Sequence, residues 1–358
     1  VCGCCVNGSA LEALQRAALG HLPRHLGAAR LTSWRLSTPG QTLRLALPEG
    51  VALSRRALDT ALVAAAIDRG AMFLPETRGR ALDRRGAVRP VQLQQSNGCF
   101  EAQARLVIAA DGLKGGAAAA ARESANEKSQ VAAGSRIGVG AVLEPPIAGL
   151  EPGCVEMICD RSGYIGMVRL EDGRLDLAAA LDPRAVRDAG GPVALLQEIL
   201  RGCDRPVPER LDAARLRGTA PLTRRPRRVA EERLLRIGDA AGYVEPFTGE
   251  GIAWALWSAL ASSRLAASWL SSEAEERDAG TDELSRRWRR EHRRLLGSKQ
   301  LVCRLTALAL RSPGAVRLGA GLLRVAPALA QPLLRALNSA PRSAGRLLDE
   351  ADKTTSSS

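Results

Sequence analysis

One segment, residues 234–252, limits the possible folds of this chain more than any other. It reads LLRIGDAAGYVEPFTGEGI and passes into an Ala/Leu/Trp-rich stretch at 252–270. The apolar start predicts a short buried strand, and the alanine- and leucine-rich stretch predicts a long helix. Asp239 would then stand at the carboxyl end of the strand, where open α/β sheets bind ligands. The glycines would let the backbone approach a ligand closely, or they would serve only the turns of a plain strand–turn–helix connection.

Earlier parts of the chain alternate between helix and strand patterns. Residues 106–110 are continuously apolar and end in Asp111-Gly112, which predicts a parallel strand with both faces covered. Ser54 is a good N-cap for a helix that ends at Gly70. Further elements expected here are a helix at 11–18 with Ser9 as cap, strands at 31–36, 42–47 and 71–74, and a hairpin at 91–93 and 99–104. This alternation is typical of α/β nucleotide-binding folds.

The middle of the chain has mainly strand patterns, and its end has helix patterns. Strand patterns at 137–143, 155–159, 163–170 and 174–180 predict an antiparallel sheet, and a helix at 185–200 is split by Gly190-Gly191. Helices are expected at 252–270, 282–310 and 315–337, the last broken by Pro327 and Pro332.

The segment 234–252 resembles the second FAD-binding motif of the FAD-dependent monooxygenase and geranylgeranyl-reductase-like superfamily. The resemblance implies that Asp239, after Gly238, accepts hydrogen bonds from the ribityl chain of FAD. It also implies that the backbone of the loop lies beside the flavin pyrimidine edge, where a helix start would stabilise the anion of the reduced ring. The loop residues concerned are Pro246, Gly249, Glu250, Gly251 and Ile252.

Weaker matches to the same superfamily occur elsewhere. Asp111-Gly112 resembles the strand end near the dinucleotide, although Leu113-Lys114-Gly115-Gly116 replaces the Ser and Arg of many members. Arg55, three residues before Leu58-Asp59, resembles an arginine that helps to hold the cofactor. A capped helix with a solvated arginine, or an ordinary Asp-Gly turn, would give the same patterns.

Two more matches concern the flavin ring and the substrate. Cys2 and Gly3 resemble a Cys-Gly-rich turn near the flavin in geranylgeranyl-reductase-like members. Tyr164 lies on a strand that resembles the substrate-facing strand of the middle sheet, where a plain sheet residue is the alternative. No residue stands out as catalytic, because flavin chemistry requires little acid–base catalysis from protein side chains.

Together these patterns predict an α/β fold with an α+β insert. We expect a Rossmann-like three-layer FAD-binding domain that lacks its first βαβ segment, an antiparallel substrate-binding sheet and C-terminal helices. The expected boundaries are 1–130 and 223–270 for the FAD-binding domain, 131–222 for the sheet, 271–352 for the helical region and 353–358 for a disordered tail. The family's GxGxxG loop and its acidic partner would precede Val1, so we expect this chain to hold FAD weakly or not at all, and a longer parent to bind it.

Composition narrows the remaining choices. The eight cysteines and three histidines are not spaced for a zinc site, so we expect no metal. Scattered thiols and the lack of an apolar run of 18 residues favour a cytoplasmic protein, with peripheral membrane contact left open. The net charge of +13 would suit phosphate-bearing cofactors or an anionic surface.

The leading functional hypothesis is an FAD-dependent monooxygenase that uses NAD(P)H and O2 to hydroxylate a small apolar or aromatic substrate. The alternative within the superfamily is a flavin-dependent reductase of isoprenoid double bonds. A hypothesis of another class is a basic module without catalysis, in which arginines at 286–294 and 224–228 bind an anionic membrane or nucleic acid. The apolar stretches that follow favour the membrane, and we do not expect a nucleic acid partner; a solvated helix face would also explain the arginines.

Overall fold

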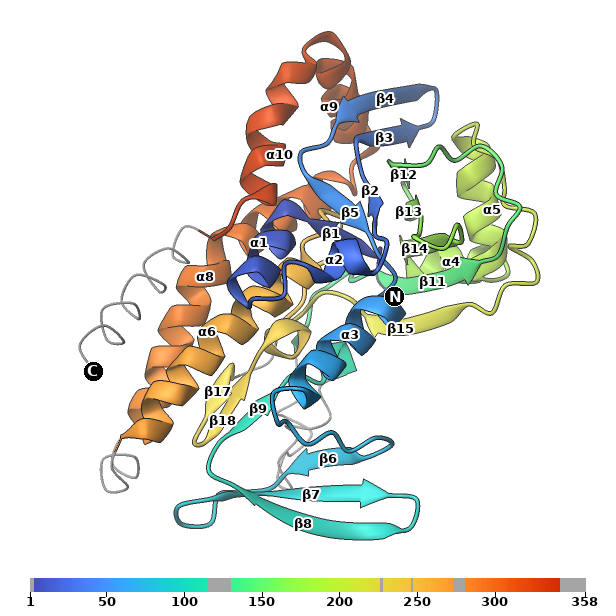
Figure 1. Cartoon of the computed structure of the whole chain (residues 1–358). Coiled ribbons are helices and arrows are strands. Elements are labelled where there is room, and N and C mark those ends of the chain that lie inside the picture. Colours follow the sequence, from blue (N-terminus) through green and yellow to red (C-terminus); the bar gives the residue numbers. More distant parts are fainter. Residues whose placement is uncertain (1–2, 115–129, 226–227, 246, 273–280, 342–358) are drawn as a thin grey trace.

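The computed structural model describes residues 3–114, 130–225, 228–245, 247–272 and 281–341 (Figure 1). The strands are β1 (Cys5–Asn7), β2 (Ala29–Arg30), β3 (Ser33–Thr38), β4 (Gln41–Ala46), β5 (Gly50–Ala52), β6 (Arg78–Ala81), β7 (Arg89–Gln95), β8 (Gly98–Ala104), β9 (Val107–Ala109), β10 (Gln130–Val131), β11 (Ile137–Leu143), β12 (Cys154–Asp160), β13 (Gly163–Arg169), β14 (Leu175–Leu181), β15 (Arg217–Pro221), β16 (Arg224–Arg225), β17 (Ala230–Glu231) and β18 (Leu234–Arg236). The α-helices are α1 (Gly8–Arg16), α2 (Leu22–His25), α3 (Arg55–Ile67), α4 (Pro183–Asp188), α5 (Pro192–Gly202), α6 (Gly251–Ser271), α8 (Thr281–Ala309), α9 (Pro313–Val325) and α10 (Ala330–Asn338). Short 3-10 helices are η1 (Gly112–Lys114), η3 (Gly238–Ala241) and η4 (Pro327–Leu329). The predicted tail at 353–358, Cys2 and Pro246 lie outside the described residues.

A seven-stranded sheet has the order β15-β11-β14-β13-β12-β3-β4. Its strands β11 to β14 are the antiparallel set that the sequence predicts. The N-terminal hairpin β3–β4 extends this sheet through a parallel pairing of β3 with β12, which the sequence did not predict. Because neighbouring residues of a strand face opposite sides, Ile165 packs under α4 and α5, while Tyr164 packs on the side covered by α9.

A second, smaller sheet carries the segments that resemble the cofactor motifs. Its order is β17-β18-β9, and β18 pairs with β9 in parallel; the apolar patterns predicted both strands but not their pairing. Helices α6 and α8 run side by side along it, and α1 packs on α6 (Figure 1). Two buried indoles join these layers: Trp288 Nε1 donates to the Arg236 carbonyl at 3.0 Å, and Trp257 Nε1 donates to the Ser9 carbonyl at 3.0 Å.

The strand expected at 71–74 is wrong. This segment is irregular, and Met72 and Phe73 are 86% and 55% exposed. An extended segment becomes a strand only when a neighbour accepts its backbone hydrogen bonds, and no described strand lies beside it. The expectation that both faces of the 106–110 strand are covered is also wrong, since Ile108 of β9 is 39% exposed.

Local signals were more dependable. Ser54 accepts a hydrogen bond from the Ala57 N–H and caps α3, and Pro39-Gly40 joins β3 to β4 as expected. Asn7, not Ser9, caps α1. The C-terminal helix breaks at Pro327 but continues through Pro332, which stands in the first turn of α10, where a proline removes no helical hydrogen bond. The predicted α/β fold class with an antiparallel insert is confirmed.

Candidate functional site

The ends of β9 and β18 meet at one edge of the small sheet. The Ile237 N–H donates to the Ala109 carbonyl at 3.0 Å, and η1 and η3, which follow the two strands, are in contact. Asp111 and Asp239 therefore stand at the same edge, Asp111 exposed and Asp239 half-buried. Two motifs that lie far apart in the sequence are thus brought together.

Glycines shape this edge. Gly112 and Gly238 have φ values of +71° and +55°, which other residues adopt only with strain. The Gly238 N–H donates to Ser258 Oγ at 3.0 Å and so ties the end of β18 to helix α6. At Gly249 (φ +68°) and Gly112, no atom of the described residues lies within 4 Å of where a Cβ would stand. The backbone at these glycines is therefore open to close approach by a ligand.

Helix α6 begins at this edge without a side-chain cap. Its N-cap residue is Glu250, whose side chain makes no capping hydrogen bond. A helix start carries unsatisfied N–H groups and a partial positive charge, and both favour an anionic group. Gly251 and the buried Ile252 form the first turn, so their backbone contributes to this environment.

The Glu250 carboxylate points instead into a buried network on helix α8. Oε1 accepts from Lys299 Nζ at 2.5 Å, and Oε2 accepts from Cys303 Sγ at 3.5 Å. Thr248 Oγ1 lies 3.0 Å from the same sulfur. Burial raises the pKa of Glu250 while Lys299 opposes the rise, and burial together with Glu250 raises the pKa of Cys303 to about 12. The network therefore holds the loop to α8 through an ion pair and a protonated thiol.

Lys299 and Cys303 were missed by the sequence analysis. They lie four residues apart, on the same side of α8 as the buried Leu295 and Leu296. A lysine on the apolar side of a predicted helix is the signal that could have found them.

An aromatic cluster lies between the large sheet and the loop. Phe247 packs edge-on against Tyr164 and Trp34, with ring centroids 5.3 and 6.1 Å away. Tyr164 is only 3% exposed, and its hydroxyl has no hydrogen-bond partner within the described residues. Burial raises the pKa of this phenol well above its usual value. Tyr164 therefore lies beside the loop, within an apolar cluster.

Charged groups adjoin this cluster. The Arg136 guanidinium lies over the Tyr164 ring, 5.4 Å from its centroid, and donates to Glu245 Oε2 at 3.4 Å. Arg311 donates to Glu245 Oε1 at 3.2 Å. Glu245 and Arg136 are almost completely buried. The sequence analysis assigned no role to these residues, because only the tertiary structure brings them together.

The remaining residues singled out in the sequence lie near the N-terminus. Arg55 forms a two-pronged ion pair with Asp59, with both hydrogen bonds at 3.0 Å. The Leu53 N–H donates to the Cys4 carbonyl at 2.9 Å, so the turn after the exposed Gly3 lies beside the segment that carries Arg55. Roles for Arg55, Gly3 and Cys2 in holding a cofactor stay predictions.

Neither a disulfide nor a metal centre is found among the described residues. The seven cysteines in the described ranges are all free thiols, so no disulfide forms among them. In the same part of the chain, no three His, Cys, Asp or Glu side chains gather in a way that could hold a metal ion.

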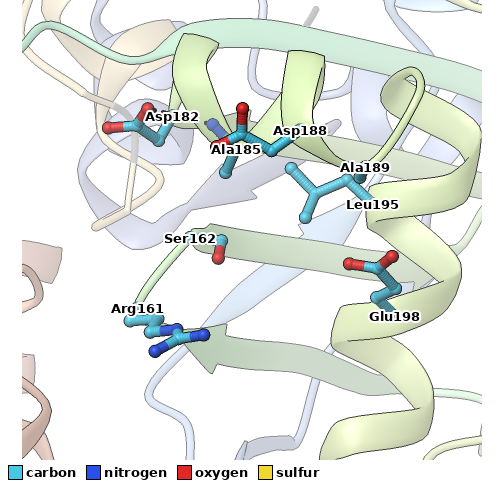
Figure 2. A pocket seen from close by; sticks show the side chains of 8 residues that line it. All are labelled: Arg161, Ser162, Asp182, Ala185, Asp188, Ala189, Leu195 and Glu198. Atoms are coloured by element: carbon cyan, nitrogen blue, oxygen red, sulfur yellow. Dashed lines mark hydrogen bonds between the residues drawn. The ribbon is translucent and has the colours of Figure 1, made fainter.

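A pocket of about 450 Å³ lies on another part of the molecule (Figure 2). Its lining comes from the turn before β13 and from the segment that includes α4 and α5: Arg161, Ser162, Asp182, Ala185, Asp188, Ala189, Leu195 and Glu198. Asp182 already caps α4 through the Arg184 N–H at 2.7 Å. None of the lining residues belongs to the motifs described above, so this hollow is separate from them.

Similarity to known proteins agrees with the geometry of the site. No family model matches the chain. A digeranylgeranylglycerophospholipid reductase of Methanopyrus kandleri is 28% identical over 297 residues, which are 74% of this chain and 70% of the relative.

Solved structures share the fold at low sequence identity. A triple mutant of the flavin-dependent brominase Bmp2 superposes with a TM-score of 0.71 at 11% identity, covering 98% of this chain and 88% of that one. HpxO of Klebsiella pneumoniae, complexed with FAD and uric acid, gives a TM-score of 0.69 at 15% identity, covering 94% and 87%. These findings confirm the predicted fold class and the resemblance to the FAD-dependent monooxygenase and geranylgeranyl-reductase-like flavoproteins.

Proposed function

We propose that this protein is an FAD-dependent monooxygenase that uses NAD(P)H and O2 to hydroxylate a small apolar or aromatic substrate. The observation that carries the proposal is the meeting of the Asp239 strand end, the open glycine backbone and the uncapped start of α6 at one edge. These features suit a ligand with hydroxyl donors at one place and a developing negative charge at another. FAD is such a ligand, and it supplies the redox chemistry when bound.

Each residue of this edge has a defined part in the proposal. Asp239 would accept hydrogen bonds from the ribityl hydroxyls of FAD, and Asp111 and Gly112 would help to hold its dinucleotide part. The N–H groups at Gly251 and Ile252, at the start of α6, would stabilise negative charge on the flavin through the partial positive charge of the helix start. Lys299 holds Glu250 away from these N–H groups, which keeps the helix start free of a competing carboxylate.

The aromatic cluster supports the choice of an apolar substrate. Trp34, Tyr164 and Phe247 lie in a hydrophobic cluster between the large sheet and α9, directly beside the motif loop. We propose that Tyr164, whose hydroxyl has no partner among the described residues, donates its hydroxyl hydrogen to an oxygen of the substrate. Arg136 lies against the same ring and would keep that phenol oriented.

A second candidate is a flavin-dependent reductase of isoprenoid double bonds. The similarity to a digeranylgeranylglycerophospholipid reductase favours it. The same cofactor edge would serve both reactions. They differ in the product, which gains an oxygen atom in the first case and two hydrogens in the second.

The test is turnover by the 358-residue chain supplied with excess FAD and NADPH. Geranylgeraniol and a panel of phenols serve as probes, in air and without oxygen, with products read by mass spectrometry. We expect oxygen-dependent NADPH consumption and an oxygen-bearing product. Alkene reduction without oxygen would establish the second candidate instead.

Two variants provide the controls. Asp239→Ala should raise the FAD concentration needed for half-maximal turnover at least about tenfold, whereas Asp188→Ala, which removes a carboxylate from the separate pocket of Figure 2, should leave it unchanged. If the chain binds FAD and yet consumes NADPH no faster than free FAD does without protein, both enzymatic candidates are contradicted and a binding module without catalysis is left.

A further inference from the structure

Two C-terminal helices expose a row of large apolar side chains to solvent. We call these six residues, which are between 55% and 85% exposed, the leucine stripe: Leu301, Leu305 and Leu308 on α8, and Leu318, Leu322 and Val325 on α9. Single exposed apolar residues are common on proteins, but a series of this length is not.

The stripe is regular on both helices. Its members follow one another at intervals of four and three residues on α8 and again on α9, so those of each helix lie on one face. The opposite faces are already packed: Cys303 of α8 belongs to the core around α6, and Leu323 of α9 joins the cluster on β3 and β4. In Figure 1, α9 lies beside β4 at the end of the large sheet. Each helix therefore has a second apolar face that the fold leaves without a partner among the described residues.

Positive charge surrounds this face. Residues 284–341 contain twelve Arg and Lys and one acidic residue, Glu291, so this segment carries eleven of the thirteen net positive charges. Arg287, Arg290 and Arg294 continue the α8 face of the stripe toward the helix start and are exposed. Arg317 and Arg324 are exposed on α9.

We propose that the leucine stripe and the arginines around it dock this protein on the surface of an anionic lipid bilayer. A helix with an apolar face and a basic polar face lies in the interfacial plane, with its apolar side chains at the acyl boundary and its cations among the headgroups. None of the described helices is long and apolar enough to cross a membrane, so the contact is peripheral.

A nucleic acid fits the same surface less well. Binding to a phosphate backbone uses Arg and Lys and gains nothing from exposed leucines. A bilayer uses both kinds of side chain that the two helices present. The proposal is independent of the flavin assignment and would survive its failure.

The experiment is flotation of the full chain with vesicles of phosphatidylcholine alone or mixed with phosphatidylglycerol, at low and high salt. We expect binding to the anionic vesicles, weakened by salt and at least about tenfold weaker on phosphatidylcholine alone. The variant Leu318→Ser/Leu322→Ser/Val325→Ser should bind at least about tenfold more weakly. Arg287→Gln/Arg290→Gln/Arg294→Gln should lose much of the preference for anionic lipid.

The matched control is Met72→Ser/Phe73→Ser, which removes exposed apolar side chains from another part of the surface and should bind like the wild type. Thermal melting checks that each variant is folded. If the leucine variant is unfolded, vesicle binding by the arginine variant tests the proposal instead. The proposal is overturned if the wild type ignores anionic vesicles at low salt, or if a folded leucine-stripe variant binds them equally well. It is also overturned if the protein binds duplex DNA but no vesicle.

Discussion

Individual residues on the two faces of helix α8 reverse the usual pattern of burial. On the inner face, Lys299 is only 9% exposed, whereas Leu301, two residues later on the outer face, is 55% exposed. The inner face meets the loop that resembles a flavin-binding motif, and the outer face carries the leucine stripe. The contrast shows that partners, and not side-chain polarity alone, decide which residues are buried.

Each face has its own physical reason. Lys299 can leave water because the buried Glu250 carboxylate lies 2.5 Å from its Nζ. The leucines stay in water because the core is already filled from the other side of the helix. We therefore expect that breaking the Lys299–Glu250 pair lowers the stability of the fold, whereas replacing the outer leucines does not.

The largest effect is expected for Lys299→Met. It leaves Glu250 buried without its cation, and the loss of one partner of a buried ion pair lowers the free energy of unfolding by about 3 to 5 kcal/mol. Urea denaturation at neutral pH measures this. The loss should also free the loop at 247–250, since Lys299 anchors it to α8.

Two controls sharpen the result. Lys299→Met/Glu250→Gln removes both charges and should recover most of the stability, because no unpaired charge is left buried. Leu301→Ser, on the outer face, should change the free energy of unfolding by less than about 0.5 kcal/mol. A Lys299→Met variant as stable as the wild type would show that the inner pair contributes nothing to the fold.

A smaller effect is expected from His292, also on the inner face. Burial lowers its pKa from 6.5 to about 4, and its Nε2 has no hydrogen-bond partner in the described part of the chain. Between these two pH values the unfolded chain binds the proton and the folded chain does not, so stability falls as the pH drops from 6.5 toward 4. The loss should reach about 3 kcal/mol.

Denaturation curves measured at a series of pH values from about 7.5 down to about 4, a range that spans both pKa values of His292, test this expectation. His292→Leu has no proton to bind in either state, so its profile should be flatter by that amount. Parallel profiles for the variant and the wild type would rule out His292 as the source of acid sensitivity.

The sequence predicted elements whose signals are local. Ser54 caps α3 through a side chain three residues from its partner, and the Pro39-Gly40 turn needs only its own residues. Asp111 and Asp239 were each predicted to follow a short apolar strand, but only the parallel pairing of β9 with β18 in the structure brings them to one edge. The pairing of β3 with β12 could not be predicted, because it joins distant segments and depends on which strand is left with a free edge.

The residues that support the site were harder to find. Lys299 stands in a helix whose other basic residues, such as Arg290 and Arg294, are exposed as a solvated face predicts. Arg136, Glu245 and Arg311 come from three separate segments, and each looks like an ordinary surface charge until the fold buries it. Burial of a charge is a tertiary property, so composition and spacing carry little information about it.

The central claim is that Asp239 and the loop at 247–252 hold FAD, and equilibrium titration of FAD into the chain, followed by flavin fluorescence, tests it most directly. We predict weak but saturable binding that Asp239→Ala weakens at least about tenfold, since a hydrogen bond to a carboxylate contributes about 1.5 to 3 kcal/mol. Asp188→Ala should bind FAD like the wild type. Saturable binding with equal affinity in the wild type and Asp239→Ala would contradict the claim.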